Sequence, residues 1–160
     1  MLRLLFAFLL LGPGILPRAV AANHCEPGHF LTLRQGPQSW HISEEKIHRL
    51  AQAQRVTSTH WSRSGTYAGP LLADVIGLAA FTTRPKQLKV YTWDNFRSSL
   101  PYADLSKYGV ILATSFNGRR LTLADWGPSY IVYPYDDFSE LKSPAGLMKM
   151  AWQVCTIVIE

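Results

Sequence analysis

Aromatic and acidic side chains that could bind a flat polar ligand recur along the chain from residue 61 onward. They stand at or near the ends of expected strands: Trp61, Trp93, Trp126, Tyr130 and Tyr133, with Asp94, Asp125 and Asp136. An aromatic face can stack on a planar ring, and a carboxylate can accept two parallel N–H hydrogen bonds from its edge. These residue types therefore favour a binding pocket.

Residues for catalysis do not assemble in the same way. The sequence offers no combination of nucleophile, base and orienting group of the kind that most enzymatic reactions need. Five histidines are spread along the chain, and none has a metal-ligand partner at suitable spacing: His24, His29, His41, His48 and His60. The sequence favours binding over catalysis and predicts no metal site.

Each binding candidate also has a purely structural alternative. Trp61 can be a core tryptophan that ends a strand, because large aromatic side chains are mostly buried for packing. Asp94 and Asp136 can cap turns, since aspartate commonly bonds to its own backbone there. Asp74 and Asp104 are expected to serve the surface and turns. These alternatives stay open at the level of the sequence.

The chain has two cysteines, Cys25 near the N-terminus and Cys155 in the final apolar segment. A pair with this separation and no flanking Cys-x-x-Cys cannot build a zinc, iron–sulfur or copper thiolate site. In an oxidising compartment a disulfide is the natural pairing, and it would close a loop of about 130 residues. The alternative is a buried Cys155 with Cys25 at a frayed end.

Residues 1–22 have the layout of a secretory signal peptide. Arg3 is followed by an almost uncharged apolar stretch and then by small residues at the usual cleavage positions. The apolar part is shorter than the about 20 residues that span a bilayer, and an uncleaved anchor is the alternative. Residues 23–160 are then expected to form a single exported domain that does not insert into the membrane.

The charge of this expected domain is small. Cleavage after residue 22 removes Arg3 and Arg18 and leaves 14 basic against 11 acidic residues, a net charge of +3. The basic residues are scattered, so the sequence does not favour nucleic acid as a partner.

The periodicity of the chain predicts an α+β domain with mixed β-sheets and a few short helices. Ser43 is a suitable N-cap for a helix over EEKIHRLAQA, and Gly69-Pro70 opens a second helix with the buried stripe Leu72, Val75, Ile76 and Ala79. Strands are expected over residues 29–33, 40–42, 56–61, 88–93, 97–100, 110–115, 121–123, 130–133 and 153–159. Asn117-Gly118 predicts a hairpin with a type I′ turn.

Several segments in a fixed order carry a resemblance to a known family. They are TYAGPLLADVI, WDNFRSSLPYADL, YGVILATSFNGRRL, WGPSYIVYPYDD and WQVCTIVIE. Together they resemble the small members of the sulfite-oxidase-type molybdopterin-binding fold, over nearly the whole chain after residue 22. In the enzymes of that fold, a cysteine just after the strand that corresponds to VTST ligates molybdenum. This chain has Trp61 or Ser62 at that place, and neither can replace a thiolate.

Within that fold the sequence is most similar to the PruR-like periplasmic proteins. The resemblance implies a periplasmic protein that binds a reduced pterin of the tetrahydropterin type without molybdenum. It also implies a partner, the periplasmic domain of a membrane-bound enzyme that makes and degrades cyclic di-GMP, and a role in regulating it. The rival functions are a small molybdopterin-dependent oxidoreductase and a non-catalytic structural partner with a vestigial pocket.

The resemblance also places the pterin site. Trp61 stands where the enzymes hold the metal, so it is expected at the pocket floor as the stacking residue. Asp94 and Asn95 match the family's acid-amide-aromatic element that reaches the pterin side, and Asp94 is expected to accept a two-point hydrogen bond. Glycine at 127 lets the backbone approach a ligand closely. The expected set is completed by Gly127, Tyr130, Tyr133 and Asp136.

Overall fold

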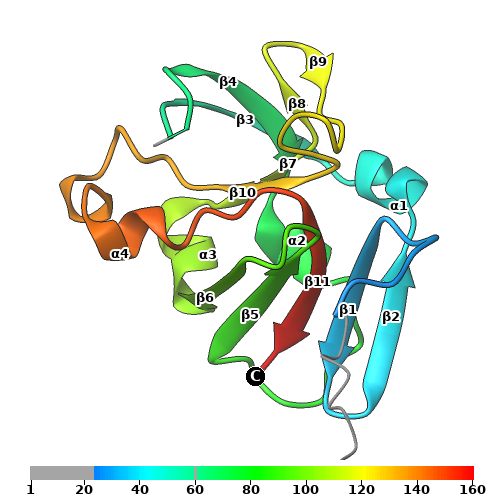
Figure 1. The fold of residues 1–160 in the computed structure, drawn as a ribbon. Helices are drawn as coiled ribbons and strands as arrows, with labels where there is room; N and C mark the ends of the chain where they lie inside the picture. The colour runs from blue at the N-terminus through cyan, green and yellow to red at the C-terminus, as the bar shows by residue number, and fades with distance from the viewer. Residues whose placement is uncertain (1–23, 60) are drawn as a thin grey trace, which may run out of the picture.

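The computed structural model describes residues 24–59 and 61–160. The expected signal peptide and His60 lie outside the described residues. Within these two ranges, no helix is long and apolar enough to cross a membrane. The secondary structure is α+β, with three sheets and short helices, as the sequence predicts (Figure 1).

The largest sheet has five strands in the order β2-β1-β11-β5-β6. They are β1 (Leu31–Gln35), β2 (Gln38–Ile42), β5 (Gln87–Thr92), β6 (Arg97–Pro101) and β11 (Val154–Ile159). The β1 and β11 strands are parallel, and the other neighbours are antiparallel. The C-terminal strand therefore lies in the middle of the sheet, directly beside the first strand (Figure 1).

The two smaller sheets carry the rest of the strands. One has the order β3-β4-β8-β9, formed by β3 (Gln52–Thr57), β4 (Gly65–Pro70), β8 (Ser115–Phe116) and β9 (Arg119–Arg120). The other pairs β7 (Ile111–Ala113) with β10 (Tyr130–Val132). Asn117 and Gly118 have φ angles of 48° and 74°, which are the left-handed values of a type I′ turn, so the predicted hairpin is confirmed between β8 and β9.

The helices are short, none longer than six residues among the described residues. They are α1 (Glu44–Arg49), α2 (Leu72–Ile76), α3 (Ala103–Tyr108), the 3₁₀ helix η1 (Ser139–Leu141) and α4 (Pro144–Leu147). The predicted cap of α1 is confirmed, because the Ser43 side chain accepts a hydrogen bond from the backbone N–H of Lys46. The predicted buried stripe is confirmed for Leu72, Val75 and Ile76 of α2, and Ala79 is also buried but follows the end of the helix.

Four elements differ from the sequence-based prediction. The first helix stops at Arg49, and residues 52–57 pair with β4 as β3, so the predicted strand over residues 56–61 is wrong beyond Thr57. Cross-strand pairing with residues 65–70 outweighs the local helical preference of this segment. Pro70 ends β4 and does not open α2. The predicted strand over residues 121–123 does not form, because the hairpin ends at Arg120.

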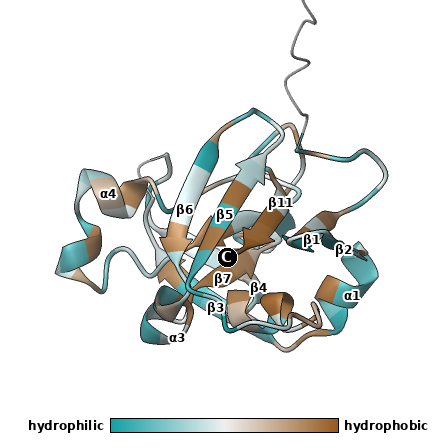
Figure 2. Cartoon of the chain, turned by 90° about the horizontal axis from the view of Figure 1, so that it is seen from below, coloured by the Kyte–Doolittle hydropathy of each residue, from teal (hydrophilic) through white to brown (hydrophobic). Residues whose placement is uncertain are grey.

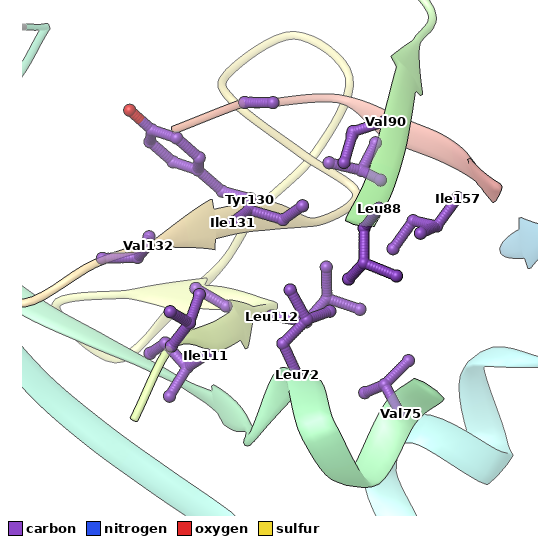
Figure 3. Close-up of a cluster of buried hydrophobic side chains, with 14 of the residues drawn as sticks. Leu72, Val75, Leu88, Val90, Ile111, Leu112, Tyr130, Ile131, Val132 and Ile157 are labelled. Carbon is purple, nitrogen blue, oxygen red and sulfur yellow. The ribbon is translucent and has the colours of Figure 1, made fainter. Parts of the chain in front are cut away.

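The core lies between the sheets and α2. Figure 2 shows hydrophobic residues on β11 and around β7, and Figure 3 shows Leu72 and Val75 of α2 beside Leu112 of β7 and Leu88 of β5. Gly69 permits this packing, since a Cβ at that position would lie 2.0 Å from the carbonyl oxygen of Leu112. A glycine is therefore required where β4 crosses β7.

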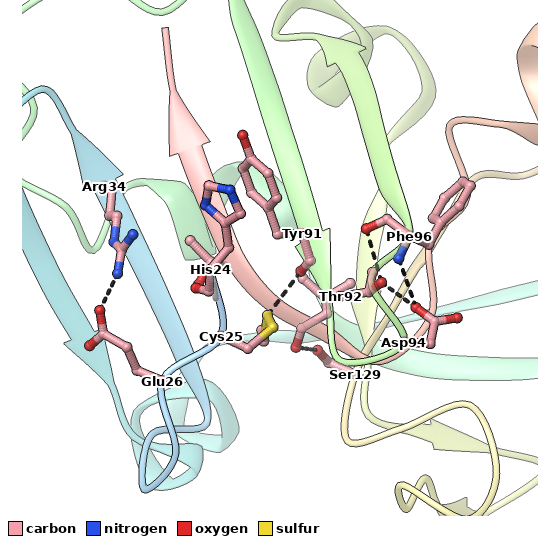
Figure 4. Close-up of a disulfide and its surroundings, with 12 residues drawn as sticks. His24, Cys25, Glu26, Arg34, Tyr91, Thr92, Asp94, Phe96 and Ser129 are labelled. Atoms are coloured by element: carbon pink, nitrogen blue, oxygen red, sulfur yellow. Dashed lines mark hydrogen bonds and ion pairs between the residues drawn. A yellow bond between two sulfur atoms is a disulfide. The ribbon is translucent and has the colours of Figure 1, made fainter. Parts of the chain in front are cut away.

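The structure contains a disulfide between Cys25 and Cys155 (Figure 4). Their Cα atoms are 5.3 Å apart, and the bond joins residues separated by 130 positions. Both side chains are buried. The bond ties the segment before β1 to β11 and supports the same pairing that the parallel β1–β11 ladder makes.

Candidate functional site

Three aromatic side chains from different parts of the sequence meet around Trp152. Tyr130 forms an isolated β-bridge with Trp152, and their ring centroids are 6.4 Å apart. Trp61 meets Trp152 edge to face at 4.8 Å, and Phe96 lies nearly parallel to it at 6.3 Å. We refer to Trp61, Phe96, Tyr130 and Trp152 as the Trp152 cluster. It joins two of the expected pterin contacts, Trp61 and Tyr130.

Trp61 is held by a tight turn after β3. The Thr59 hydroxyl oxygen accepts hydrogen bonds from the backbone N–H groups of Trp61 at 3.2 Å and of Ser62 at 3.1 Å. The Thr59 N–H donates to the Ser62 carbonyl at 3.2 Å. The Trp61 side chain is 54% exposed, so the alternative of a core tryptophan that ends a strand is wrong.

A chain of hydroxyl groups lies beneath this turn. The Ser62 hydroxyl is 2.7 Å from the Tyr67 hydroxyl and 3.1 Å from that of Thr59. Tyr67 is fully buried, and its ring centroid is 5.7 Å from that of Tyr130. Burial raises the pKa of Tyr67, and the bonds from Ser62 and Thr59 offset part of that effect. Tyr67 therefore stays neutral and can donate or accept a hydrogen bond.

The Tyr130 hydroxyl is the unsatisfied group of the site. Tyr130 is 0% exposed, and its hydroxyl makes no hydrogen bond within the part of the chain that the structure describes. Burial raises its pKa strongly. The Thr59 hydroxyl lies near enough to offset part of the rise, although it does not reach hydrogen-bonding geometry. Figure 3 shows the hydroxyl pointing away from the aliphatic core. A buried polar group without a partner costs about 1–3 kcal/mol, so a ligand atom that bonds to it would recover this free energy.

Asp94 positions Trp152 and caps its own turn. One carboxylate oxygen, Oδ1, accepts bonds from the Thr92 hydroxyl and from the Phe96 N–H, as Figure 4 shows. The other, Oδ2, accepts a bond from Trp152 Nε1 at 2.8 Å. A carboxylate offers about four acceptor positions, so one remains for a ligand, on Oδ2. The two-point hydrogen bond expected of Asp94 would therefore require the loss of one of these internal bonds.

Asn95 follows Asp94 in the same turn and is exposed. Its φ angle of 64° lies in the left-handed region, which asparagine tolerates better than most residues. This backbone conformation lets Asp94 bond to the Phe96 N–H. The acid-amide-aromatic element of the sequence is thus a turn that presents Asp94 and Phe96 to Trp152.

Two other residues expected to contact the pterin, Gly127 and Tyr133, contact other parts of the protein. A Cβ on Gly127 would lie 2.4 Å from the carbonyl carbon of Leu121, so the close approach that this glycine permits is to the chain itself. The Tyr133 hydroxyl donates to Asp104 Oδ2 at 3.0 Å, and Lys149 Nζ donates to the same oxygen at 2.7 Å. Asp104 is 7% exposed, so its expected role at the surface is wrong.

Asp136 anchors the loop that carries Trp61. Its two carboxylate oxygens accept hydrogen bonds from the Ser58 N–H and the Ser58 hydroxyl, both at 2.6 Å. Its own N–H donates to the Thr57 hydroxyl at 3.1 Å. The bond from the Ser58 hydroxyl is the main reason that the pKa of Asp136 lies below its usual value. Asp136 therefore acts as a positioning residue for the segment that leads from β3 to Thr59.

We expect acidification to weaken this anchor. The folded-state pKa of Asp136 is depressed, so its bonds contribute stability that is present above the ordinary pKa of 3.8 and is lost as the pH falls through the lower folded value. Asp136→Asn should therefore lose less stability than the wild type between about pH 5 and pH 2. Thermal unfolding across that range measures it, with the exposed neighbour Asp137→Asn as control. Equal acid losses in the wild type and Asp136→Asn would contradict the assignment.

The remaining aromatic candidates line other hollows. Trp126 and Asp125 belong to a cavity of about 490 Å³ with Phe116, Arg119 and Arg120. Trp93 belongs to a different cavity of about 470 Å³, which His29 and His41 also line. The candidates that the sequence groups together are thus divided among separate surfaces.

The structure adds residues that the sequence-based prediction missed. Trp152 is the centre of the cluster, and its position just before the final strand is the signal that could have identified it. Thr59, Ser62 and Tyr67 supply the hydroxyl chain. Their chemistry depends on a turn and on strand pairing that no local pattern indicates.

No family model and no curated protein matches the chain. Among solved structures, the chain is similar to the sulfane dehydrogenase SoxCD from Paracoccus pantotrophus, with a TM-score of 0.61 and 16% sequence identity. The match covers 82% of this chain and 38% of that one, so the chain spans well under half of the length of SoxCD. At this identity the likeness shows the fold alone, and it supports the sulfite-oxidase-type fold that the sequence motifs predict.

Proposed function

We propose that the protein binds a reduced pterin of the tetrahydropterin type at the Trp152 cluster, without molybdenum. The observation that carries the proposal is the fully buried Tyr130 hydroxyl without a hydrogen-bond partner among the described residues, beside a cluster in which Trp61 is 54% exposed. A flat, polar ligand would cover the indole and, after a side-chain movement that uncovers the Tyr130 hydroxyl, satisfy that hydroxyl.

The chemistry of the cluster suits a pterin. A pterin is a flat bicycle with an aminopyrimidinone edge that carries both donors and acceptors. Trp61 offers an exposed aromatic face, and aromatic stacking contributes about 0.5–1.5 kcal/mol beyond the buried area. Asp94 offers one acceptor position, and the Tyr130 hydroxyl can donate or accept. Three contacts from different segments would fix the orientation of the ring.

The residues present do not suit a molybdenum centre of the sulfite-oxidase type. That centre needs a cysteine thiolate after β3, where the chain has Trp61 and Ser62, and the Ser62 hydroxyl is bonded to Tyr67. Both cysteines are joined in the disulfide. The rival function, a molybdopterin-dependent oxidoreductase, therefore lacks its protein ligand to the metal.

We further propose a regulatory role in the periplasm, with the periplasmic domain of a membrane-bound cyclic di-GMP enzyme as partner. The sequence resemblance supports this part of the proposal. A ligand can bias such a partner only through different affinities for the free and partner-bound protein. A pull-down of the partner domain with and without a tetrahydropterin tests it, and equal recovery in both conditions would contradict it.

The Tyr130→Phe substitution tests whether the Tyr130 hydroxyl contacts the ligand, because it removes the hydroxyl and keeps the ring in the core. We expect it to weaken tetrahydropterin binding by about 0.5–1.5 kcal/mol and to stabilise the free protein by about 1 kcal/mol, because it removes a buried hydroxyl that has no partner. Trp61→Ala and Asp94→Ala should each weaken binding by about 1–3 kcal/mol. Anaerobic titration calorimetry and thermal unfolding measure the two quantities.

Trp126→Ala is the matched control, since this tryptophan is half-buried and lines a different cavity. It should leave the affinity unchanged. A Tyr130→Phe variant that gains stability and binds the pterin as tightly as the wild type would contradict the site. About one molybdenum per purified chain by elemental analysis would contradict the metal-free function.

A further inference from the structure

Three side chains with metal-ligating atoms meet at the N-terminal edge of the five-stranded sheet. The ligand atoms of Glu26, His29 and His41 all lie within 4.8 Å of one another. In the sequence these residues are separated by spacings that match no metal-binding motif. Their meeting is a product of the tertiary structure, and it does not depend on the proposed pterin site.

The backbone around the three residues is well fixed. The disulfide at Cys25 anchors Glu26 to the sheet. Pro27 and Gly28 form a turn, and Gly28 has a φ of 90°, which a glycine adopts without strain. This turn brings His29 back toward His41, which pairs with β1 from β2. The two imidazole rings lie 3.9 Å apart and nearly parallel.

Arg34 orients the Glu26 carboxylate by pairing with one of its oxygens, and the other oxygen faces His41. Arg34 forms an ion pair with Oε1, as Figure 4 shows. The other oxygen, Oε2, is 3.9 Å from His41 Nδ1. An outer partner that fixes a carboxylate in this way is common around metal ligands, where it sets the direction of the free oxygen.

The distances permit coordination after small side-chain movements. Zinc binds nitrogen and oxygen ligands at about 2.0–2.2 Å, which places two ligands of a tetrahedral site about 3.4 Å apart. His29 and His41 are exposed, so rotation of their side chains can close the present spacing without moving the core. The adjoining cavity of about 470 Å³ gives access for an ion and for a water at the fourth position.

We propose that Glu26, His29 and His41 bind a divalent transition-metal ion of the Zn²⁺ class. Two imidazoles and one carboxylate, with an open fourth position, match the donors that Zn²⁺ and its neighbours accept. Hard ions such as Mg²⁺ prefer all-oxygen sites and are not expected to bind here.

Titration calorimetry of the tag-free protein with ZnCl₂ tests the site. We expect one Zn²⁺ per chain, and a loss of affinity of at least tenfold in His29→Ala, His41→Ala and Glu26→Gln. The control is His48→Ala, an exposed histidine on α1 that bonds to Glu44, and it should bind within about twofold of the wild type. Titration with Co²⁺ should give the visible absorption of a tetrahedral site, and Glu26→Gln should weaken that signal.

Two results would overturn the proposal. One is the absence of Zn²⁺ binding to the wild type. The other is equal Zn²⁺ affinity in the wild type, His29→Ala and His41→Ala while thermal unfolding shows all three to be folded. Because the two histidines are exposed, their substitution should leave folding intact and keep the test decisive.

Discussion

Removal of the Cys25–Cys155 bond should destabilise the protein by about 4–5 kcal/mol. The bond closes a loop between residues 130 positions apart, and a cross-link over so long a loop removes much entropy from the unfolded chain. It also joins the first segment to β11 in the middle of the large sheet. A Cys25→Ala/Cys155→Ala double variant, compared with the wild type by denaturant unfolding, measures the effect.

Reductant provides the control for this prediction. It should lower the stability of the wild type toward that of the double variant and leave the double variant unchanged. Mass measurement of non-reduced protein should show the loss of two hydrogens relative to the reduced form. Two thiols that alkylate without prior reduction would contradict the disulfide.

The second large effect is expected at Asp104. Asp104→Ala should lower the free energy of unfolding by about 3–5 kcal/mol. The substitution leaves the ammonium of Lys149 and the buried hydroxyl of Tyr133 without their shared acceptor. The Asp104 side chain is 10% exposed and the Lys149 side chain is 24% exposed. Water therefore cannot fully replace the acceptor that the substitution removes. Urea unfolding measures the loss of free energy.

Two further variants make the Asp104 result specific. Asp74→Ala, on the exposed side of α2, should change stability by less than about 0.5 kcal/mol. Asp104→Asn keeps an acceptor oxygen and loses the charge, so it should fall between the wild type and Asp104→Ala. Equal stabilities of Asp104→Ala and Asp74→Ala would show that the network contributes nothing. Unchanged pterin affinity in Asp104→Asn would agree with a structural role for Tyr133.

Local sequence patterns were sufficient for several elements. The stripe on α2 follows from a periodicity that its own residues carry, and the Asn117-Gly118 hairpin follows from the φ angles that these residues tolerate. The Ser43 cap depends on a bond to a residue three positions away. These interactions are short in sequence, so they can be read without knowledge of the fold.

The end of α1 and the course of β3 required the tertiary structure. Residues 52 and 53 fit a helix locally, yet they pair with β4, which is joined to β3 by a turn of its own. Strand pairing depends on partners elsewhere in the chain, so local preference does not determine it. This shift moves Trp61 out of a strand and into the exposed turn where it can meet a ligand.

The composition of the candidate site was likewise only partly contained in the sequence. Residue types and strand ends indicated Trp61, Asp94 and Tyr130. In the structure, the bridge between Tyr130 and Trp152 helps to bring these three residues together. The other candidates bond elsewhere, Tyr133 to Asp104 and Asp136 to Ser58. The sequence determined which groups could stack, accept or donate. Only the packing of distant segments decided which of these groups share one site, because hydrogen bonds and ring contacts depend on spatial distance and not on separation along the chain.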